Sequence, residues 1–339
     1  MAATMYPELA RLLLILRNKM GLEIDKKRGS ITDAISSIEW IPIGDEKNVC
    51  KAVAASDSSF ILVESRIAML YVLQGISQLY TIDSGKIATR DSDRFYDAGF
   101  IESTDRRVAT RRSAFKKALT AHAYLNEVES IGRIASRGSI DLALLDGSLL
   151  SFLVARRDIA KSMTIESVYG SKDLNYVYSR KVQTIEELAQ KTTLVFTAKS
   201  SSVSFYTQSN YTDFQLFEMA RIYRIPPYFE AGYSKPLDIE LSGDIKRFLG
   251  LEECSLKGFI VTYARLQRNS QVFQLSIPYI DRKPDIDMVV KCVRAFSPAG
   301  YPLPLDVVHR LSKLSRRSLK EFLIRVGFPV ASGREFIEL

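Results

Sequence analysis

Two aspartates are the residues of this chain best placed for metal-assisted chemistry, because each follows a short apolar segment that predicts a buried strand. Asp57 follows VCKAVAAS at residues 49–56, and Asp146 follows IDLALL at residues 140–145. Carboxylates that meet at neighbouring strand ends can hold Mg²⁺ or Mn²⁺ and leave positions for water and a phosphate group. A cation held there lowers the pKa of water and stabilises charge on a leaving oxygen. The alternative is that Asp-Ser and Asp-Gly only form turns, as such dipeptides commonly do.

Other devices for chemistry are absent from the sequence. It contains no GxxxxGK[ST] phosphate loop, no GxGxxG, no HExxH and no GxSxG, which excludes ATP-driven and zinc-protease chemistry of the familiar kinds. The chain has 2 histidines, His122 and His309, so carboxylates must do most of any catalytic work. Its 3 cysteines, Cys50, Cys254 and Cys292, are far apart and form no CxxC. We therefore expect neither a disulfide framework nor a thiolate zinc site, and a reducing cytoplasm suits the chain.

The composition is that of an ordinary globular protein with a basic balance of charge. Of 339 residues, 46% are hydrophobic and 25% are charged, which excludes wholesale disorder, collagen and coiled-coil folds. The formal net charge of +8 favours polyanionic partners such as nucleic acid or an anionic membrane surface. Apolar stretches such as Leu12 to Leu16 are far shorter than the roughly 20 residues that cross a bilayer. We therefore expect neither membrane insertion nor export.

The elements that must position the aspartates can be predicted from periodicity. Apolar residues spaced three and four apart predict an amphipathic helix over residues 6–20, which Gly21 is expected to end. Three strands are expected to form an antiparallel meander. The first covers residues 49–57 and ends at Asp57, and the other two lie within residues 60–80, which are interrupted at Ser65-Arg66 and at Gly75.

A long helix is predicted over residues 103–138, after a mixed, turn-prone stretch at residues 86–100. Its length leaves open whether one helix or two form. Its second half carries Glu127 and Glu129. Its first half is basic, with Arg106, Arg107, Arg111, Arg112, Lys116 and Lys117. Phosphate contacts from such a run give affinity for nucleic acid without sequence preference, although a solvated helix face explains it equally well.

The second half of the chain alternates strands and helices and ends in helices. The predicted strands, of which the last two form a hairpin, cover residues 140–145, 193–197, 258–265 and 272–279. The predicted helices cover residues 149–163, 184–190, 285–296, 305–314 and 318–326.

The order and spacing of five short motifs resemble the NurA nucleases of archaeal DNA-end processing, over most of the chain. The motifs are VAASDSS (53–59), a glutamate pair at 127 and 129, LALLDGSL (142–149), YGSKD (169–173) and GYPLPLDVVHRL (300–311). One position departs from the family pattern, since Asp57-Ser58-Ser59 stands where the family commonly has Asp-Gly-Ser. A serine can occupy many turns, so the departure does not exclude metal binding.

The resemblance implies a single NurA-like nuclease domain of the α/β class over residues 1–339. Its ribonuclease H-like core, similar to the nuclease domain of Argonaute proteins, would be a mixed sheet flanked by helices, with an added hairpin and C-terminal helices. Residues 1–48 would form the N-terminal helix and a connection, residues 49–200 the first part of the core, and residues 201–339 the hairpin and the helices that complete the site. The implied activity is Mn²⁺- or Mg²⁺-dependent cleavage of DNA, as a single-strand endonuclease and a 5′-to-3′ exonuclease.

The resemblance also implies which residues bind the metal, namely Asp57, Asp146, Glu129 and His309. Glu129 is preferred to Glu127 because the family's third carboxylate falls on this helix at about this distance from the aspartate of the DGSL motif. A neutral imidazole at His309 suits either Mn²⁺ binding or protonation of a leaving group. The alternatives are a solvated helix face for Glu129 and a buried structural histidine for His309, and the choice between the two glutamates stays open.

Further residues are expected to contact the nucleic acid. Tyr301 is expected to contact the phosphate through its hydroxyl, and Lys172 is expected to neutralise charge on the scissile phosphate. Each has a structural or solvated alternative. Arginines of the basic run are expected to bind the DNA backbone: Arg106, Arg107, Arg111 and Arg112.

The family acts as a dimer and engages a hexameric HerA-type ATPase, so the resemblance implies DNA, a second copy of the chain and this helicase ring as partners. The role would be DNA end resection in DNA repair and homologous recombination, with the recombination nuclease/ATPase complex of double-strand-break repair as a further candidate partner. No membrane partner is expected, and the expected location is the cytoplasm, at the nucleoid. The dimer interface is expected at the aromatic residues 226–233 or near Phe322 and Phe328.

Two other interpretations of the same residues are open at this point. A non-catalytic nucleic-acid-binding or scaffold protein would keep the ribonuclease H-like fold and use Asp57 and Asp146 only in turns. Another ribonuclease H-like enzyme, such as a resolvase or an RNA-directed nuclease, would share the metal site and differ in its substrate.

Overall fold

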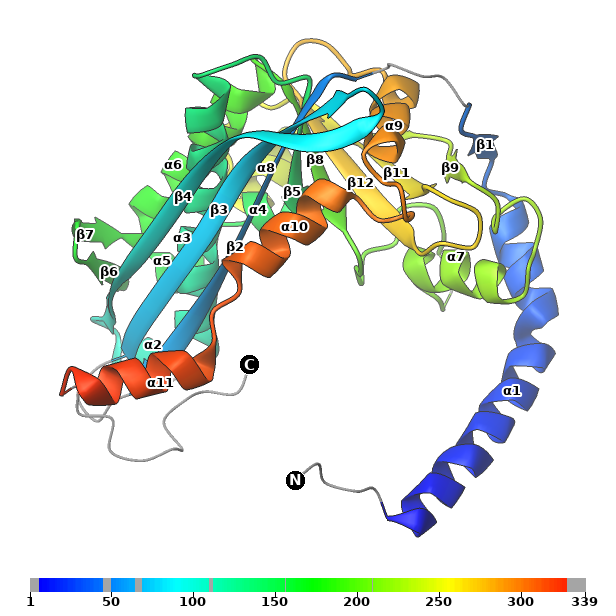
Figure 1. The fold of residues 1–339 in the computed structure, drawn as a ribbon, viewed down its shortest axis with the longest axis horizontal. Helices are drawn as coiled ribbons and strands as arrows, with labels where there is room; N and C mark the ends of the chain where they lie inside the picture. The colour runs from blue at the N-terminus through cyan, green and yellow to red at the C-terminus, as the bar shows by residue number, and fades with distance from the viewer. Residues whose placement is uncertain are drawn as a thin grey trace.

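The protein is built on a mixed sheet that carries helices on both faces, as its computed structural model shows (Figure 1). The structure describes residues 6–44, 50–64, 69–109, 112–155, 157–208 and 210–327. The strands are β1 (Trp40–Pro42), β2 (Ala52–Glu64), β3 (Met69–Asp83), β4 (Lys86–Ser103), β5 (Leu142–Asp146), β6 (Met163–Ser167), β7 (Gly170–Asp173), β8 (Thr193–Ala198), β9 (Gly232–Ser234), β10 (Leu237–Glu240), β11 (Gly258–Arg265) and β12 (Val272–Tyr279). The helices are α1 (Pro7–Ser36), α2 (Arg106–Ala109), α3 (Arg112–Ala135), α4 (Leu149–Leu153), α5 (Arg157–Ala160), α6 (Leu174–Ala189), α7 (Asp213–Ile222), α8 (Gly243–Leu249), α9 (Ile286–Ala295), α10 (Leu303–Ser312) and α11 (Arg316–Arg325).

The described strands form one sheet in the order β1-β9-β11-β12-β8-β5-β2-β3-β4-β6-β7, with β10 paired to β11 outside this path. At its centre, β2, β3 and β4 form an antiparallel meander, whereas β2 pairs with β5 and β5 pairs with β8 in parallel. We expected such a meander within a mixed sheet flanked by helices, so the predicted fold class is confirmed. The predicted hairpin β11–β12 does not stand apart from the core, because β12 pairs with β8 and extends the same sheet.

The two faces of the sheet carry separate hydrophobic cores. Ala143 and Leu145 of β5 pack in the core that α3 and α6 share, whereas Leu142 and Leu144 pack in the core that α9 and α10 share. Because successive side chains of a strand point to opposite faces, a strand covered on both sides needs a continuous apolar run. The sequence LALL satisfies this requirement, and its strand was predicted correctly.

α1 is 30 residues long and continues through Gly21, where the sequence predicted its end. A glycine inside a helix costs only about 1 kcal/mol, and packing further along the helix outweighs that cost. Ile31 and Ile35 are fully buried, and the hydroxyl of Tyr228 donates a hydrogen bond to the carbonyl of Ile35. The first half of α1 extends away from the sheet (Figure 1) and exposes Leu9 and residues 11–16. No helix in the described part of the chain, α1 included, is long and apolar enough to cross a membrane.

The boundaries predicted for the meander were wrong at two places. β2 continues past Asp57, and residues 86–100 form most of β4 rather than turns. Backbone groups carry the pairing in a sheet, so a polar side chain does not end a strand that has a partner. Asp57 pairs with Ile76 of β3, and β4 pairs with β3 along nearly its whole length.

Gly75 does not break the meander either, because it lies within β3. A Cβ atom at this position would stand 2.1 Å from the Cζ atom of Phe95 and 2.9 Å from the backbone oxygen of Asp57. The ring of Phe95 therefore occupies the space that a side chain would need. Glycine is required here because the ring of Phe95 approaches the backbone closely, and not because the chain turns.

Two predicted helices have other bounds in the structure. Residues 149–163 form the two short helices α4 and α5, and residues 184–190 are the end of the longer α6. The backbone N–H of Ala155 donates to the carbonyl of Leu249. It is therefore not available for the hydrogen bond that would continue α4. α6 begins earlier because the side chain of Asp173 accepts a hydrogen bond from the backbone of its first turn.

A disulfide joins Cys50 and Cys292, whose Cα atoms are 5.2 Å apart, so the expectation of no disulfide was wrong. The two cysteines are separated by 242 residues, and only the tertiary fold brings them together. The bond ties the residues just before β2 to α9. Cys254 is buried and free.

Reduction of this disulfide should lower the thermal stability of the protein. A bridge that closes a long loop restricts the unfolded chain and typically stabilises the fold by about 2–4 kcal/mol. We expect dithiothreitol to lower the melting temperature of the wild type, measured by scanning fluorimetry, and to have no effect on Cys50→Ser/Cys292→Ser. Cys254→Ala keeps the bridge and should respond to the reductant as the wild type does. A wild-type melting temperature that ignores the reductant would contradict this prediction.

Candidate metal centre

Three predicted site residues, Asp57, Asp146 and His309, meet at one place in the fold. Each offers one ligand atom, and these three atoms all lie within 4.8 Å of one another. They come from β2, from the end of β5 and from α10, which are far apart in the sequence. The donor set is two carboxylate oxygens and one imidazole nitrogen, which suits a divalent cation such as Mn²⁺.

The parallel pairing of β2 with β5 places the two aspartates side by side. Its register aligns Ser56 with Leu145, so the next residue of each strand, Asp57 and Asp146, lies at the same level of the sheet. α10 crosses over β2 and β3 (Figure 1) and brings His309 to this level. Asp146 ends its strand as predicted, whereas Asp57 lies in the middle of a long one.

Asp57 is held by α10. The Nδ1 atom of His309 lies 2.8 Å from Oδ2 of Asp57, and the hydroxyl of Ser312 donates to the same oxygen over 3.0 Å. The side chain of Asp57 is 12% exposed, whereas that of His309 is 45% exposed. The carboxylate thus forms the floor of the centre, and the imidazole stands at its open side.

Negative charge at this centre is poorly compensated. Burial raises the pKa of Asp57; the hydrogen bond from His309 opposes this rise, and the charge of Asp146 adds to it. Burial also raises the pKa of Glu127 well above its ordinary value, and the charges of Asp57 and Asp146 add to the rise, which a hydrogen bond from Ser58 opposes. A cation bound among these carboxyl groups would offset the repulsion and favour their ionised forms.

Glu127, and not the expected Glu129, lies near enough to the centre for the charges of Asp57 and Asp146 to act on it. Glu127 is 3% exposed, its Oε1 accepts a hydrogen bond from Ser58, and its Oε2 is buried without a hydrogen-bond partner. Glu129 instead makes an ion pair with Arg180 of α6, with 3.4 Å between Nε and Oε1. Positions two apart on a helix point about 200° apart, so only one of the two glutamates can face the sheet. The orphaned oxygen of Glu127 fits a site that a metal ion completes.

Lys199 belongs to the site and was missed from the sequence. Its Nζ atom donates to Oδ2 of Asp146 over 2.6 Å and lies 5.2 Å from the centre of the Tyr301 ring. Burial raises the pKa of Tyr301, so the hydroxyl keeps its proton at neutral pH. Lys199 follows β8, the parallel neighbour of β5, so the rule that pointed to Asp146 would also have pointed to Lys199.

Lys172, the other expected phosphate contact, lies far from the centre. It is in β7 at the edge of the sheet, with β3, β4 and β6 between β7 and β2. At roughly 4.8 Å per strand, this places it about 19 Å from β2. The expected role of Lys172 is therefore not supported by its position, because the YGSKD motif forms the turn and edge strand of a hairpin.

The basic run is divided by the fold. Arg106 and Arg107 lie on α2 and Arg112 begins α3, and all three are exposed. Arg111 lies outside the described residues. Lys116 and Lys117, further along α3, are exposed as well.

The sequence matches the family model of the NurA domain over residues 51–314. None of the curated proteins matches the chain. Among solved structures, the NurA nuclease from Sulfolobus solfataricus aligns with a TM-score of 0.66 at 17% identity, covering 95% of this chain and 97% of that chain. A NurA with manganese has a TM-score of 0.56 at 14% identity, with 95% and 98% covered. A NurA bound to dAMP and manganese has a TM-score of 0.55 at 15% identity, with 93% and 96% covered. At these identities the likeness shows a shared fold.

Mn²⁺ should stabilise the folded protein through this centre. A ligand that binds only the folded state at about 100 times its Kd adds about 2.7 kcal/mol. We expect Mn²⁺ to raise the melting temperature of the wild type and of Glu129→Gln. Asp57→Asn, Asp146→Asn and Glu127→Gln should lose most of this rise, since each removes a charged oxygen from the centre.

Glu127→Gln and Glu129→Gln are matched variants on one helix, and thermal scans with and without Mn²⁺ compare them directly. Equal responses of these two variants would contradict the choice of Glu127. If Mn²⁺ raised the melting temperature of Asp57→Asn or Asp146→Asn as much as that of the wild type, the assignment of the metal centre itself would be contradicted.

Proposed function

The chain belongs to the NurA family, and we propose that it is a nuclease that hydrolyses DNA with Mn²⁺ or Mg²⁺ held by Asp57, Asp146 and His309. The observation that carries this proposal is the convergence of these three ligands from separate elements, with the orphaned carboxyl oxygen of Glu127 beside them. A turn role for the two aspartates does not explain such a convergence. Glu127 takes the place of Glu129 as the third carboxylate.

The centre offers the groups that phosphodiester hydrolysis requires. When bound, a divalent cation activates water and stabilises the negative charge that develops on the phosphate. Lys199, held at Asp146, supplies a positive charge beside the position of the phosphate. The protonated hydroxyl of Tyr301 can donate to a phosphate oxygen.

DNA is the proposed substrate, cleaved as a single strand by endonuclease action and from the 5′ end by exonuclease action. The net charge of +8 supports a polyanionic substrate. A solved NurA of the same fold is bound to dAMP and manganese, which supports a deoxynucleotide at the centre. Arg106, Arg107 and Arg112 are exposed and are proposed to contact the DNA backbone.

The proposed cellular role is DNA end resection with a hexameric HerA-type ATPase, in repair and homologous recombination. The sequence has no phosphate loop, so movement along a long DNA end would have to come from such a partner. The cytoplasm, at the nucleoid, is the location that this role requires.

A homodimer is the proposed assembly, and two exposed apolar surfaces support it. On α1, Leu12 is 61% exposed and Leu14 is 58% exposed; on α11, Phe322 is 60% exposed. Apolar side chains gathered on one surface are typical of interfaces. The aromatic segment at residues 226–233 is a weaker candidate than expected, because Tyr228 and Tyr233 are buried inside the protein. Phe328 lies outside the described residues.

Removal of one metal ligand should abolish cleavage. We expect the wild type to cut labelled single-stranded DNA with Mn²⁺ or Mg²⁺ and to be inactive with a chelator. Asp146→Asn should lower the rate by more than about 100-fold, since the bound cation contributes several kcal/mol. Lys172→Met, at the far edge of the sheet, is the control and should retain activity. Parallel assays with duplex DNA and RNA establish the substrate; a folded Asp146→Asn that cuts at the wild-type rate would leave a binding or scaffold protein as the better explanation.

The isolated protein should be a dimer. Light scattering at micromolar concentration should give about twice the chain mass of 38.2 kDa. Leu12→Glu/Leu16→Glu should reduce this mass to that of one chain, because a charged side chain is costly in a buried apolar interface. Lys86→Glu, at the exposed start of β4, is a control for the added charge. A monomeric wild type would contradict the proposal.

A further inference from the structure

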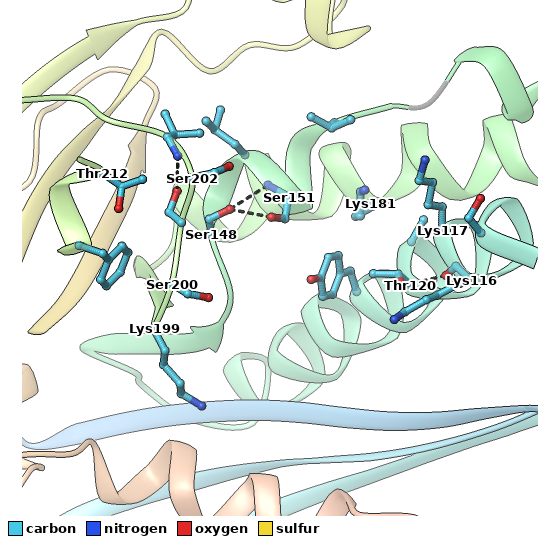
Figure 2. A pocket seen from close by; sticks show the side chains of 18 of the residues that line it. Lys116, Lys117, Thr120, Ser148, Ser151, Lys181, Lys199, Ser200, Ser202 and Thr212 are labelled. Atoms are coloured by element: carbon cyan, nitrogen blue, oxygen red, sulfur yellow. Dashed lines mark hydrogen bonds between the residues drawn. The ribbon is translucent and has the colours of Figure 1, made fainter. Parts of the chain in front are cut away.

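A cavity of about 1140 Å³ lies next to the metal centre, among α3, α4, α6, α7 and the segment after β8 (Figure 2). Its volume is slightly above the roughly 300–1,000 Å³ that ligand pockets enclose, so it can hold one or a few nucleotides but not a duplex. Hydroxyls of Ser148, Ser151 and Ser202 line one part of it. The catalytic role proposed above uses none of these groups.

Lys181 of α6 is a buried cation at the wall of this cavity. It is 1% exposed, and its Nζ atom lies 4.9 Å from the centre of the Tyr178 ring. Among the described residues, no carboxylate makes an ion pair with it. Burial lowers the pKa of Lys181 to about 7. An ammonium group without a counter-charge is costly inside a protein, and an anion in the cavity would offset that cost.

Further lysines place positive charge at both ends of the cavity. Lys116 and Lys117 of α3 lie at one end, and Lys199 lies at the other (Figure 2). The carboxylate that lines the cavity in the described part of the chain is Glu218, and it is already paired with Arg221 and Arg265. The cavity therefore favours an anionic ligand.

Lys199 connects the cavity to the metal centre. It lines the cavity, and the same side chain donates to Oδ2 of Asp146. Ser148 stands two residues after Asp146 and also lines the cavity. A chain with phosphates at regular intervals could therefore place one phosphate at the metal centre and the next ones in the cavity.

Flat apolar side chains complete the walls. Tyr124 stacks on Phe152 with 3.7 Å between ring centroids, and Tyr124 and Phe214 both line the cavity. Unpaired bases stack on such rings without regard to base identity, whereas the bases of a duplex are already stacked on one another.

We propose that this cavity holds the unpaired nucleotides next to the cleaved phosphodiester, with Lys181 neutralising one of their phosphates. The proposal rests on the proposed nuclease function and adds where the unpaired strand is held and which buried side chain neutralises its phosphate. It also assigns Lys116 and Lys117 a function at the entrance, where the next phosphates of the strand would pass.

The test measures binding of a labelled oligothymidylate of about eight nucleotides by fluorescence anisotropy, in the presence of chelator so that no cleavage occurs. Lys181→Met should weaken binding roughly tenfold, as expected for loss of one charge-assisted contact. It should also reduce the slope of log affinity against log salt by about 0.7. Lys191→Met removes an exposed lysine at the opposite end of β8 and should change neither quantity. The melting temperature of Lys181→Met should equal or exceed that of the wild type, because an uncompensated buried ammonium is removed.

Three results would overturn the proposal. The first is an unchanged oligothymidylate affinity in folded Lys181→Met. The second is an equal loss for a blunt duplex, which cannot enter the cavity. The third is that Lys181→Met weakens the binding of thymidine monophosphate and leaves the binding of the oligonucleotide unchanged. The cavity would then be a site for free nucleotides. The assay needs neither metal nor cleavage. The binding results can therefore be interpreted even if the protein proves not to be a nuclease.

Discussion

The parallel pairing of β2 with β5 places the carboxylates of Asp57 and Asp146 side by side in a largely buried position. Neighbouring groups partly offset their repulsion. α10 supplies an imidazole and a hydroxyl to Asp57, and Lys199 supplies an ammonium to Asp146. Glu127 adds a third carboxyl group rather than relieving the first two. The stability of the fold alone does not explain three carboxyl groups so close together, since buried charges are normally paired. A divalent cation is the natural remaining partner.

Sequence predicted the parts of the fold where local pattern and tertiary environment agree. The run LALL must be buried on both faces, so its strand and the aspartate at its end were found. Local pattern failed where a partner strand overrides polarity, as in β4 and in β2 around Asp57. It failed again at Gly21, because Ile31 and Ile35, which anchor α1 in the core, lie at least ten residues further along the chain.

The sequence predicted those site residues that follow a predicted strand or lie in a motif. The motifs named Asp57, Asp146 and His309, which the fold brings together, but the choice between Glu127 and Glu129 depends on which way α3 is rotated against the sheet. No local signal near the two glutamates reports that rotation. Lys172 was misplaced because a motif fixes neighbours in sequence, whereas the β6–β7 hairpin carries this lysine to the sheet edge. Lys199 follows β8 and could have been found by the strand-end rule, whereas Lys181 carries no motif and only its burial identifies it.

The disulfide has a consequence for the covalent integrity of the chain. Because Cys50 and Cys292 are joined, everything from the start of β2 to α9 lies in one closed loop. Both aspartates are inside that loop, and His309 follows a short distance beyond it. A protease that cuts any exposed turn within the loop would therefore leave the two fragments attached to each other. The metal ligands would remain on a single molecule until the bridge itself was reduced.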